Sequence, residues 1–201
     1  SKLLEPPLTG RLKKPLPLVV GGKPNAEIVY TPDALGVVSN AAKELRYWVR
    51  TISGAELPIV TNEGPAAVKI LLNSPEGADK FAADVEWLKK GAGDDGYFVR
   101  TVGNRVYIGC AYTSAESRNP PPGTPMKDWR TPPVPAGVLR GVDRFIENNF
   151  GLIFAYCPRS WSYDREVDES EFGTVYDETN NLSVVWGDAA DRPKTKYRQS
   201  E

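Results

Sequence analysis

The sequence predicts an α+β fold, a two-layer sandwich in which a mixed β-sheet carries about three helices. Two long segments with continuous apolar stripes, residues 31–54 and 138–151, would form most of the helical layer. Short apolar runs between them have the length and composition of strands. A predicted hairpin interrupts the alternation of strands and helices, which favours this fold over a doubly wound sheet.

The N-terminal residues 1–17 are predicted to form an arm. They contain four prolines and the basic residues Arg11, Lys13 and Lys14, a composition typical of an arm rather than a core element. Two short strands follow at residues 18–20 and 26–30. The Gly-Gly and Pro-Asn pairs between them indicate a turn.

The first helix is the most clearly patterned element of the chain. Thr31-Pro32-Asp33 has a capping side chain followed by a proline, which predicts a helix start. Apolar residues then recur at three- and four-residue intervals, at Leu35, Val38, Ala42, Leu45, Val49 and Ile52. Gly54 follows the last of them and predicts the end of the helix.

The middle of the chain is predicted to form two strands, a helix and a hairpin. Residues 57–60 form a short strand whose proline indicates an edge position, and Val68–Leu72 is apolar enough for a central strand. Residues 79–90 have a helical pattern. Strands at Tyr97–Val102 and residues 106–111 form a hairpin across Gly103-Asn104.

A proline-rich insert separates this hairpin from the next helix. Residues 118–137 contain seven prolines, so we expect a long surface loop without regular structure. Val138, Val142, Phe145 and Ile146 give the following helix its apolar face. Gly151 ends it, and residues 152–156 form a strand. Near the C-terminus, residues 174–176 and 182–186 form a hairpin, and the last residues form an extended tail.

Composition excludes several function classes. The 25 basic and 26 acidic residues nearly balance, so we expect no nucleic-acid partner. The chain contains no histidine, which excludes Ser-His-Asp and Cys-His catalysis and the usual zinc sites. No apolar run approaches the roughly 20 residues that span a bilayer, and no phosphate loop or cysteine cluster is present. We therefore expect no membrane span, no metal site and no cofactor.

Three segments, in order, carry a resemblance to a known family. They are AAKELRYW (41–48) with TISGAELPI (51–59), GYFV (96–99) with VYIG (106–109), and GVLRGVDRFIE (137–147) with Phe150-Gly151. Their order resembles the non-catalytic N-terminal α+β domain of α-glucuronidases, β-N-acetylhexosaminidases and related bacterial glycoside-hydrolase-like proteins. The insert departs from the family pattern, which has a short link at that place.

The resemblance implies an accessory domain that packs against a catalytic barrel or shapes access to it. A (β/α)₈ barrel needs about 250 residues, and only 44 follow Cys157, so no catalytic carboxylate is carried over to this chain. The expected organisation is an arm (1–17), an accessory domain (18–157) with its insert (118–137), and a segment (158–201) that either extends this domain or begins the next. The resemblance also implies a secreted, periplasmic or cell-surface protein. Because the sequence opens at Ser1 without an initiator Met and its first residues are polar and rich in proline, we expect a mature or trimmed chain.

Aromatic side chains in the predicted loops offer an alternative function. Trp129, Trp161 and Tyr163 have apolar ring faces that would stack on sugar rings, although loop aromatics also cover core edges. This alternative is a free-standing module that binds glycan or protein through the insert and these aromatics. Pro120-Pro121-Pro122 would then present a polyproline ligand, or simply stiffen the loop.

Two sets of charged residues are also candidate sites. Asp94 and Asp95 are adjacent carboxylates. Glycoside hydrolysis uses two carboxylates about 5–9.5 Å apart across the substrate, but Asp before Gly is also ordinary turn chemistry. On the helix after the insert, opposite charges three residues apart predict a salt-bridged surface or a partner contact. The expected pairs are Arg140 with Asp143 and Arg144 with Glu147.

Two covalent features remain open. Cys110 and Cys157 fall at the ends of predicted strands, where they form either one disulfide or two buried thiols. Asn181-Leu182-Ser183 matches the N-glycosylation acceptor pattern, which is also common by chance.

Overall fold

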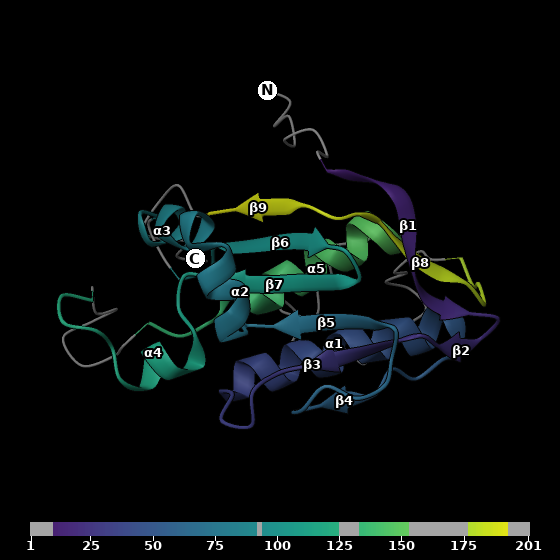
Figure 1. The fold of residues 1–201 in the computed structure, drawn as a ribbon, viewed down its shortest axis with the longest axis horizontal. Helices are drawn as coiled ribbons and strands as arrows, with labels where there is room; N and C mark the ends of the chain where they lie inside the picture. Colours follow the sequence, from purple (N-terminus) through teal and green to yellow (C-terminus); the bar gives the residue numbers. More distant parts are fainter. Residues whose placement is uncertain (1–9, 92–93, 125–132, 153–176, 193–201) are drawn as a thin grey trace, which may run out of the picture.

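The computed structural model describes residues 10–91, 94–124, 133–152 and 177–192, and these form the predicted α+β fold with a mixed sheet (Figure 1). Its strands are β1 (Arg11–Val20), β2 (Lys23–Pro24), β3 (Ala26–Val29), β4 (Ile59–Val60), β5 (Val68–Leu72), β6 (Tyr97–Val102), β7 (Arg105–Cys110), β8 (Leu182–Trp186) and β9 (Ala189–Asp191). Its helices are α1 (Gly36–Ser53), α2 (Pro75–Lys80), α3 (Ala82–Lys89), α4 (Ser114–Arg118) and α5 (Gly137–Phe150).

The main sheet has the strand order β4-β3-β5-β7-β6-β9. Strands β4, β3, β5 and β7 are parallel to one another, while β6 runs antiparallel to both of its neighbours. A smaller antiparallel sheet of β2, β1 and β8 lies at one end of the main sheet (Figure 1). The short β4 is an edge strand and β5 is internal, as predicted.

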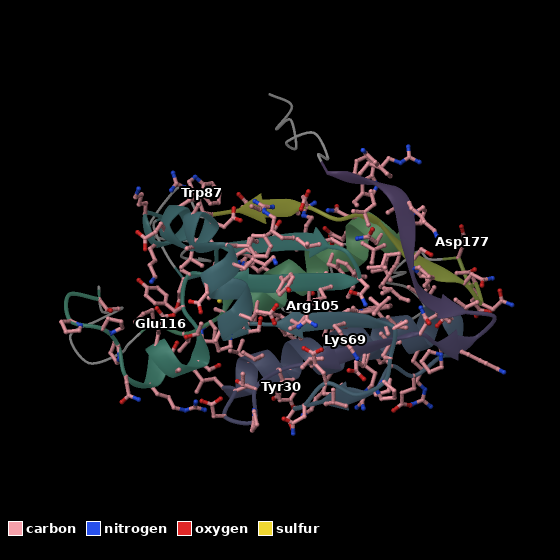
Figure 2. The ribbon with its side chains drawn as sticks, in the orientation of Figure 1. Tyr30, Lys69, Trp87, Arg105, Glu116 and Asp177 are labelled. Atoms are coloured by element: carbon pink, nitrogen blue, oxygen red, sulfur yellow. The ribbon has the colours of Figure 1, made fainter. Side chains whose placement is uncertain are left out.

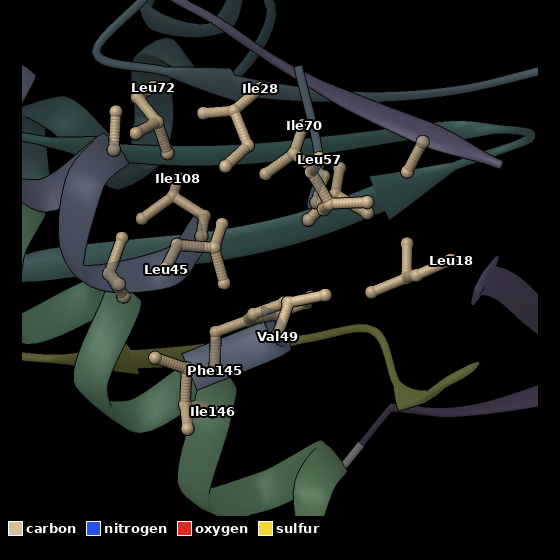
Figure 3. Packing of buried hydrophobic residues seen from close by; sticks show 14 of the residues in the cluster. Leu18, Ile28, Leu45, Val49, Leu57, Ile70, Leu72, Ile108, Phe145 and Ile146 are labelled. Carbon is tan, nitrogen blue, oxygen red and sulfur yellow. The ribbon is translucent and has the colours of Figure 1, made fainter. Parts of the chain in front are cut away.

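The larger core lies between the main sheet and the helices α1 and α5. Leu45 of α1 and Phe145 of α5 meet Ile28, Ile70 and other sheet residues there, and all are buried (Figure 3). A second, smaller core lies on the opposite face of the sheet, where α2 and α3 pack. The sheet therefore carries two long helices on one face and two short ones on the other.

Two glycines allow α5 to approach the hairpin of β6 and β7 closely. A Cβ at Gly141 would lie 2.6 Å from Cγ2 of Ile108, and a Cβ at Gly137 would overlap the carbonyl oxygen of Gly96. Both glycines belong to the third segment of the family resemblance. Their role here is steric, because real Cβ atoms are essentially never found below 3.0 Å from such neighbours.

Most predicted ends of elements are confirmed. Gly54 and Gly151 follow α1 and α5 in the left-handed conformation, with φ of 71° and 65°. Gly103, with φ of 60°, lies in the turn between β6 and β7. A left-handed backbone conformation favours glycine because glycine has no Cβ, so these positions can be predicted from the sequence.

Three predicted boundaries are wrong. Helix α1 begins at Gly36 rather than at Thr31, since the Ala34 amide donates to the Thr31 carbonyl and closes a separate turn. Residues 11–17 are not a free arm, because β1 begins at Arg11 and pairs with β8. The helix expected at 79–90 is broken at Phe81, whose backbone leaves the helical region while its ring packs in the smaller core.

The described C-terminal residues belong to this domain. Strand β8 pairs with β1 in the small sheet, and β9 adds to β6 at the edge of the main sheet. The predicted strand at 182–186 is therefore confirmed, with β1 as its described partner. Residues 153–156 and 174–176, expected to form strands, and the tail from 193 lie outside the described residues, as does the N-terminal end of the predicted arm.

Candidate functional site

The candidate site is the edge of the main sheet where the parallel strands β3, β5 and β7 reach their carboxyl ends. The chain leaves β3 for α1 on one face of the sheet and leaves β5 for α2 on the other. This reversal makes a topological switch point, and ligands in open α/β sheets bind at such points. The side chains at this edge are therefore the first candidates for a binding or catalytic site.

Asn73, the residue after β5, organises this edge. It is 5% exposed and adopts φ of 50°, a left-handed conformation that asparagine tolerates. Its Nδ2 donates to the Tyr112 carbonyl at 3.0 Å and contacts Sγ of Cys110 at 3.2 Å, while its Oδ1 accepts from the Ser114 amide at 2.9 Å. Asn73 thus holds the segment after β7 against the end of β5, and its own polar atoms are engaged by the protein.

The short helix α4 covers the switch point and was not predicted from the sequence. Thr113 and Glu116 form a capping box, the signal that could have revealed it. Burial acts to raise the pKa of Glu116, but hydrogen bonds from Thr113 and Lys89 outweigh it and keep that pKa below its usual value. Ser114 Oγ accepts from the Leu35 amide at 3.1 Å, which ties α4 to the start of α1.

The two ends of the proline-rich insert are fixed at this same edge. One end follows α4, whose Arg118 pairs with Asp33 at 3.2 Å. The other end is held by Asp94, which is 8% exposed, accepts from the Val134 amide through Oδ2 at 3.3 Å and from the Gly137 amide through its carbonyl at 3.1 Å. The edge therefore anchors the insert at its entry and at its return.

Asp94 and Asp95 do not act as a pair. Asp94 fixes the returning insert, whereas Asp95 forms an ion pair with Arg140 of α5 at 3.2 Å. Each carboxylate has its own structural partner, which supports the turn interpretation over the hydrolytic one. The predicted Arg140–Asp143 pair is wrong, since Arg140 pairs with Asp95; the Arg144–Glu147 pair is confirmed at 3.3 Å.

All three predicted glycan-binding residues lie outside the described part of the chain. They are Trp129, Trp161 and Tyr163, so glycan contact through them stays a prediction. Cys157 also lies outside it, and the bridge to Cys110 is likewise untested. Cys110 itself is buried, and burial raises the pKa of its thiol to about 12.

A polar cluster on the face covered by α2 was missed by sequence reasoning. Arg105, which Figure 2 labels, donates to Glu63 at 2.6 and 2.9 Å, to Glu76 at 2.8 Å and to the Tyr107 hydroxyl at 3.0 Å. The hydrogen bond to Glu63 is the main reason why the pKa of Arg105 is raised. Burial raises the pKa of Tyr107, and its hydrogen bond to Glu76 adds to this.

Beside this cluster, Lys69 and Glu27 form a buried ion pair between neighbouring strands. Lys69 Nζ lies 2.6 Å from Glu27 Oε1 and 2.6 Å from the Gly64 carbonyl. The signal in the sequence is a charged residue inside each of two otherwise apolar strands, and β3 and β5 pair these positions. Both groups are engaged in closing the loop that contains Gly64, which is a structural role.

No protein-family model and no curated protein matches this chain. Among the described residues, the cysteine, aspartate and glutamate side chains do not gather in groups of three that would hold a metal ion. Among the described helices, none has the length and apolar character needed to cross a membrane.

Proposed function

We propose that this chain is a non-catalytic accessory domain of a glycoside-hydrolase-like protein. It would pack against a catalytic barrel, supplied by the same polypeptide or by a partner, and shape access to that barrel. The observation that supports this best is the packing of the three resemblance segments as one unit. Helix α1 lies beside α5, and α5 lies across β6 and β7.

The chemistry of the candidate site favours support over catalysis. If this edge catalysed hydrolysis, it would have to use its polar groups, which are Asn73, Asp94, Asp95 and Glu116. Each instead holds a segment of the domain, through the contacts given above. A general acid needs a proton-transfer partner within hydrogen-bond reach in a substrate complex, and these groups already hold structural partners.

The insert is the part of the domain through which access to a barrel would be shaped. Both of its described ends are tied to the carboxyl edge, by Arg118 to Asp33 and by Asp94 to Val134. The described residues at both ends are therefore held against the domain, where they can present a defined surface to a neighbouring domain. We propose that this surface borders the substrate entrance.

Cross-linking of the native protein tests this proposal. The protein would be captured from source cells with an antibody against the domain, treated with a lysine- and carboxylate-reactive cross-linker, and analysed by peptide mass spectrometry. We expect cross-links from Lys89 or Glu116 to the sequence of a (β/α)₈ barrel. Cross-links confined to this domain, in a preparation without any hydrolase sequence, would overturn it.

A further inference from the structure

The outer surface of α1, away from the candidate site, contains a hollow of about 510 Å³. It is lined by Asn40, Lys43, Glu44, Arg46, Tyr47, Arg50 and Glu56. Tyr47 is one of the few large hydrophobic side chains exposed in the described structure, at 58%. The hollow is within the size range of small-molecule sites, roughly 300–1,000 Å³. We propose that it binds an anionic pyranose unit of a glycan.

The tyrosine ring supplies a platform for such a ligand. Tyr47 packs against Trp48 edge to face, with ring centroids 5.1 Å apart and an interplanar angle of 79°. This contact limits the motion of the Tyr47 ring while the ring stays exposed. An exposed aromatic face is apolar and flat, and it matches the apolar C–H face of a pyranose ring.

The side chains around Tyr47 are held in place by contacts of their own. Arg46 and Arg50 both pair with Glu56, at 3.5 and 3.4 Å. The Trp48 indole donates to Glu44 at 2.7 Å. Side chains that are ordered before binding lose less conformational entropy when a ligand arrives.

The polar groups of the hollow fit the hydroxyl groups of a sugar. Guanidinium groups and the Asn40 amide donate hydrogen bonds, and the two carboxylates and the amide oxygen accept them. Sugar hydroxyls are both donors and acceptors, so a mixed lining suits them better than an apolar one. A purely apolar ligand would shield these groups from water and offer nothing to their remaining donors and acceptors.

The charge of the hollow favours an acidic sugar. Lys43, Arg46 and Arg50 face two carboxylates, which leaves one positive charge. Lys43 carries that charge, since it makes no ion pair with any other described residue, whereas both arginines are paired with Glu56. A carboxylate or sulfate on the sugar would supply the missing partner. This inference goes beyond the accessory role and holds whether or not a barrel is attached.

A glycan array with matched variants tests the site. The array would carry carboxylated, sulfated and neutral pyranose oligosaccharides, and each glycan bound would then be titrated while the amide NMR signals of α1 are followed. The carboxylated and sulfated sets separate the two sources of negative charge. The variants are Tyr47→Ala, Tyr47→Phe and Lys43→Gln, with Trp87→Ala as the control. Trp87 is an exposed aromatic on α3, across the sheet from α1.

We expect an acidic glycan to bind and to shift the amide signals of residues 40–50. Tyr47→Ala should weaken this binding about 10-fold because it removes the apolar platform, while Tyr47→Phe and Trp87→Ala should leave it within about 2-fold. Lys43→Gln should weaken it about 3-fold and reduce its dependence on salt. Because Lys43 and Tyr47 are exposed, the melting temperatures of their three variants should stay close to that of the wild type. Trp87→Ala also removes a ring contact with Arg192, so its binding is compared at a temperature at which the variant is folded.

Three results would overturn the inference. The first is that the wild-type protein binds no acidic glycan on the array more strongly than the Tyr47→Ala variant does. The second is that glycan binding shifts the amide signals of residues outside 40–50 and that these shifts are still seen in the Tyr47→Ala variant. The third is a preference for neutral glycans that Lys43→Gln does not change.

Discussion

Replacing Asp143 by asparagine is expected to stabilise the domain at neutral pH. Asp143 lies on α5 and is only partly exposed, and it makes no ion pair or hydrogen bond with another described residue. Burial, followed by the nearby carboxylates of Glu44 and Glu147, raises its pKa from 3.8 to about 6; Arg140 lowers it only in part. The negative charge of Asp143 is therefore unfavourable in the folded state.

The sign of the effect follows from proton linkage. Between pH 3.8 and about 6, the protonated fraction of Asp143 is larger in the folded state than in the unfolded state. Stability from this group is thus fully present below pH 3.8 and is lost as the pH rises through about 6. Two pH units correspond to about 3 kcal/mol at most. Partial exposure of the carboxylate lowers this to about 1–2 kcal/mol.

Urea unfolding, followed by tryptophan fluorescence at pH 4 and pH 7.5, measures this difference. Asp143→Asn should raise the free energy of unfolding by about 1–2 kcal/mol at pH 7.5 and change it little at pH 4, where the native carboxyl is already neutral. Asp79→Asn, at an exposed carboxylate on α2, is the matched control and should have no such effect. An Asp143→Asn protein whose stability gain is absent, or is equal at both pH values, would refute the reasoning.

Three further predictions concern packing and buried chemistry. Gly141→Ala should destabilise the domain by about 1–3 kcal/mol in urea unfolding, because its methyl group would lie 2.6 Å from a β7 side chain; Gly36→Ala, with open space around its Cβ, is the control and should be neutral. Lys69→Met should cost about 3–5 kcal/mol because it leaves Glu27 buried without its partner, and adding Glu27→Leu should recover most of the loss; a double variant as unstable as the single one would contradict this. Iodoacetamide at pH 8 should leave Cys110 unmodified in the native protein and alkylate it in urea, as read by peptide mass spectrometry, because its buried thiol has a pKa of about 12; rapid native labelling would contradict its burial.

Elements marked by local chemistry were predictable from the sequence. The apolar stripe of α1 and the glycines at 54, 103 and 151 are signals that depend only on helix periodicity and on backbone freedom. The start of α1 was misplaced for a tertiary reason: the Leu35 amide is bound by Ser114, which lies far away in the sequence. The extent of β1 was missed in the same way, because it depends on pairing with β8 near the other end of the chain.

The candidate site was less predictable than the fold. Asn73 gave no sequence signal, because its importance comes from three segments that meet only at the carboxyl edge. Asp94 and Asp95 are adjacent in the sequence, but the fold gives them separate partners, the returning insert and α5. A pattern of neighbouring carboxylates cannot reveal that division, since it depends on where the insert returns.

The intact mass of the native gene product tests the central claim most directly. Antibody capture from source cells under denaturing conditions, followed by mass spectrometry, would give the length of the polypeptide that contains this domain. An accessory domain with its barrel in the same polypeptide predicts a product longer by about 250 residues or more. If the barrel belongs to a partner, native capture should recover a hydrolase in a fixed ratio to the domain. A product of about the present length, recovered natively without any hydrolase, would contradict the accessory role.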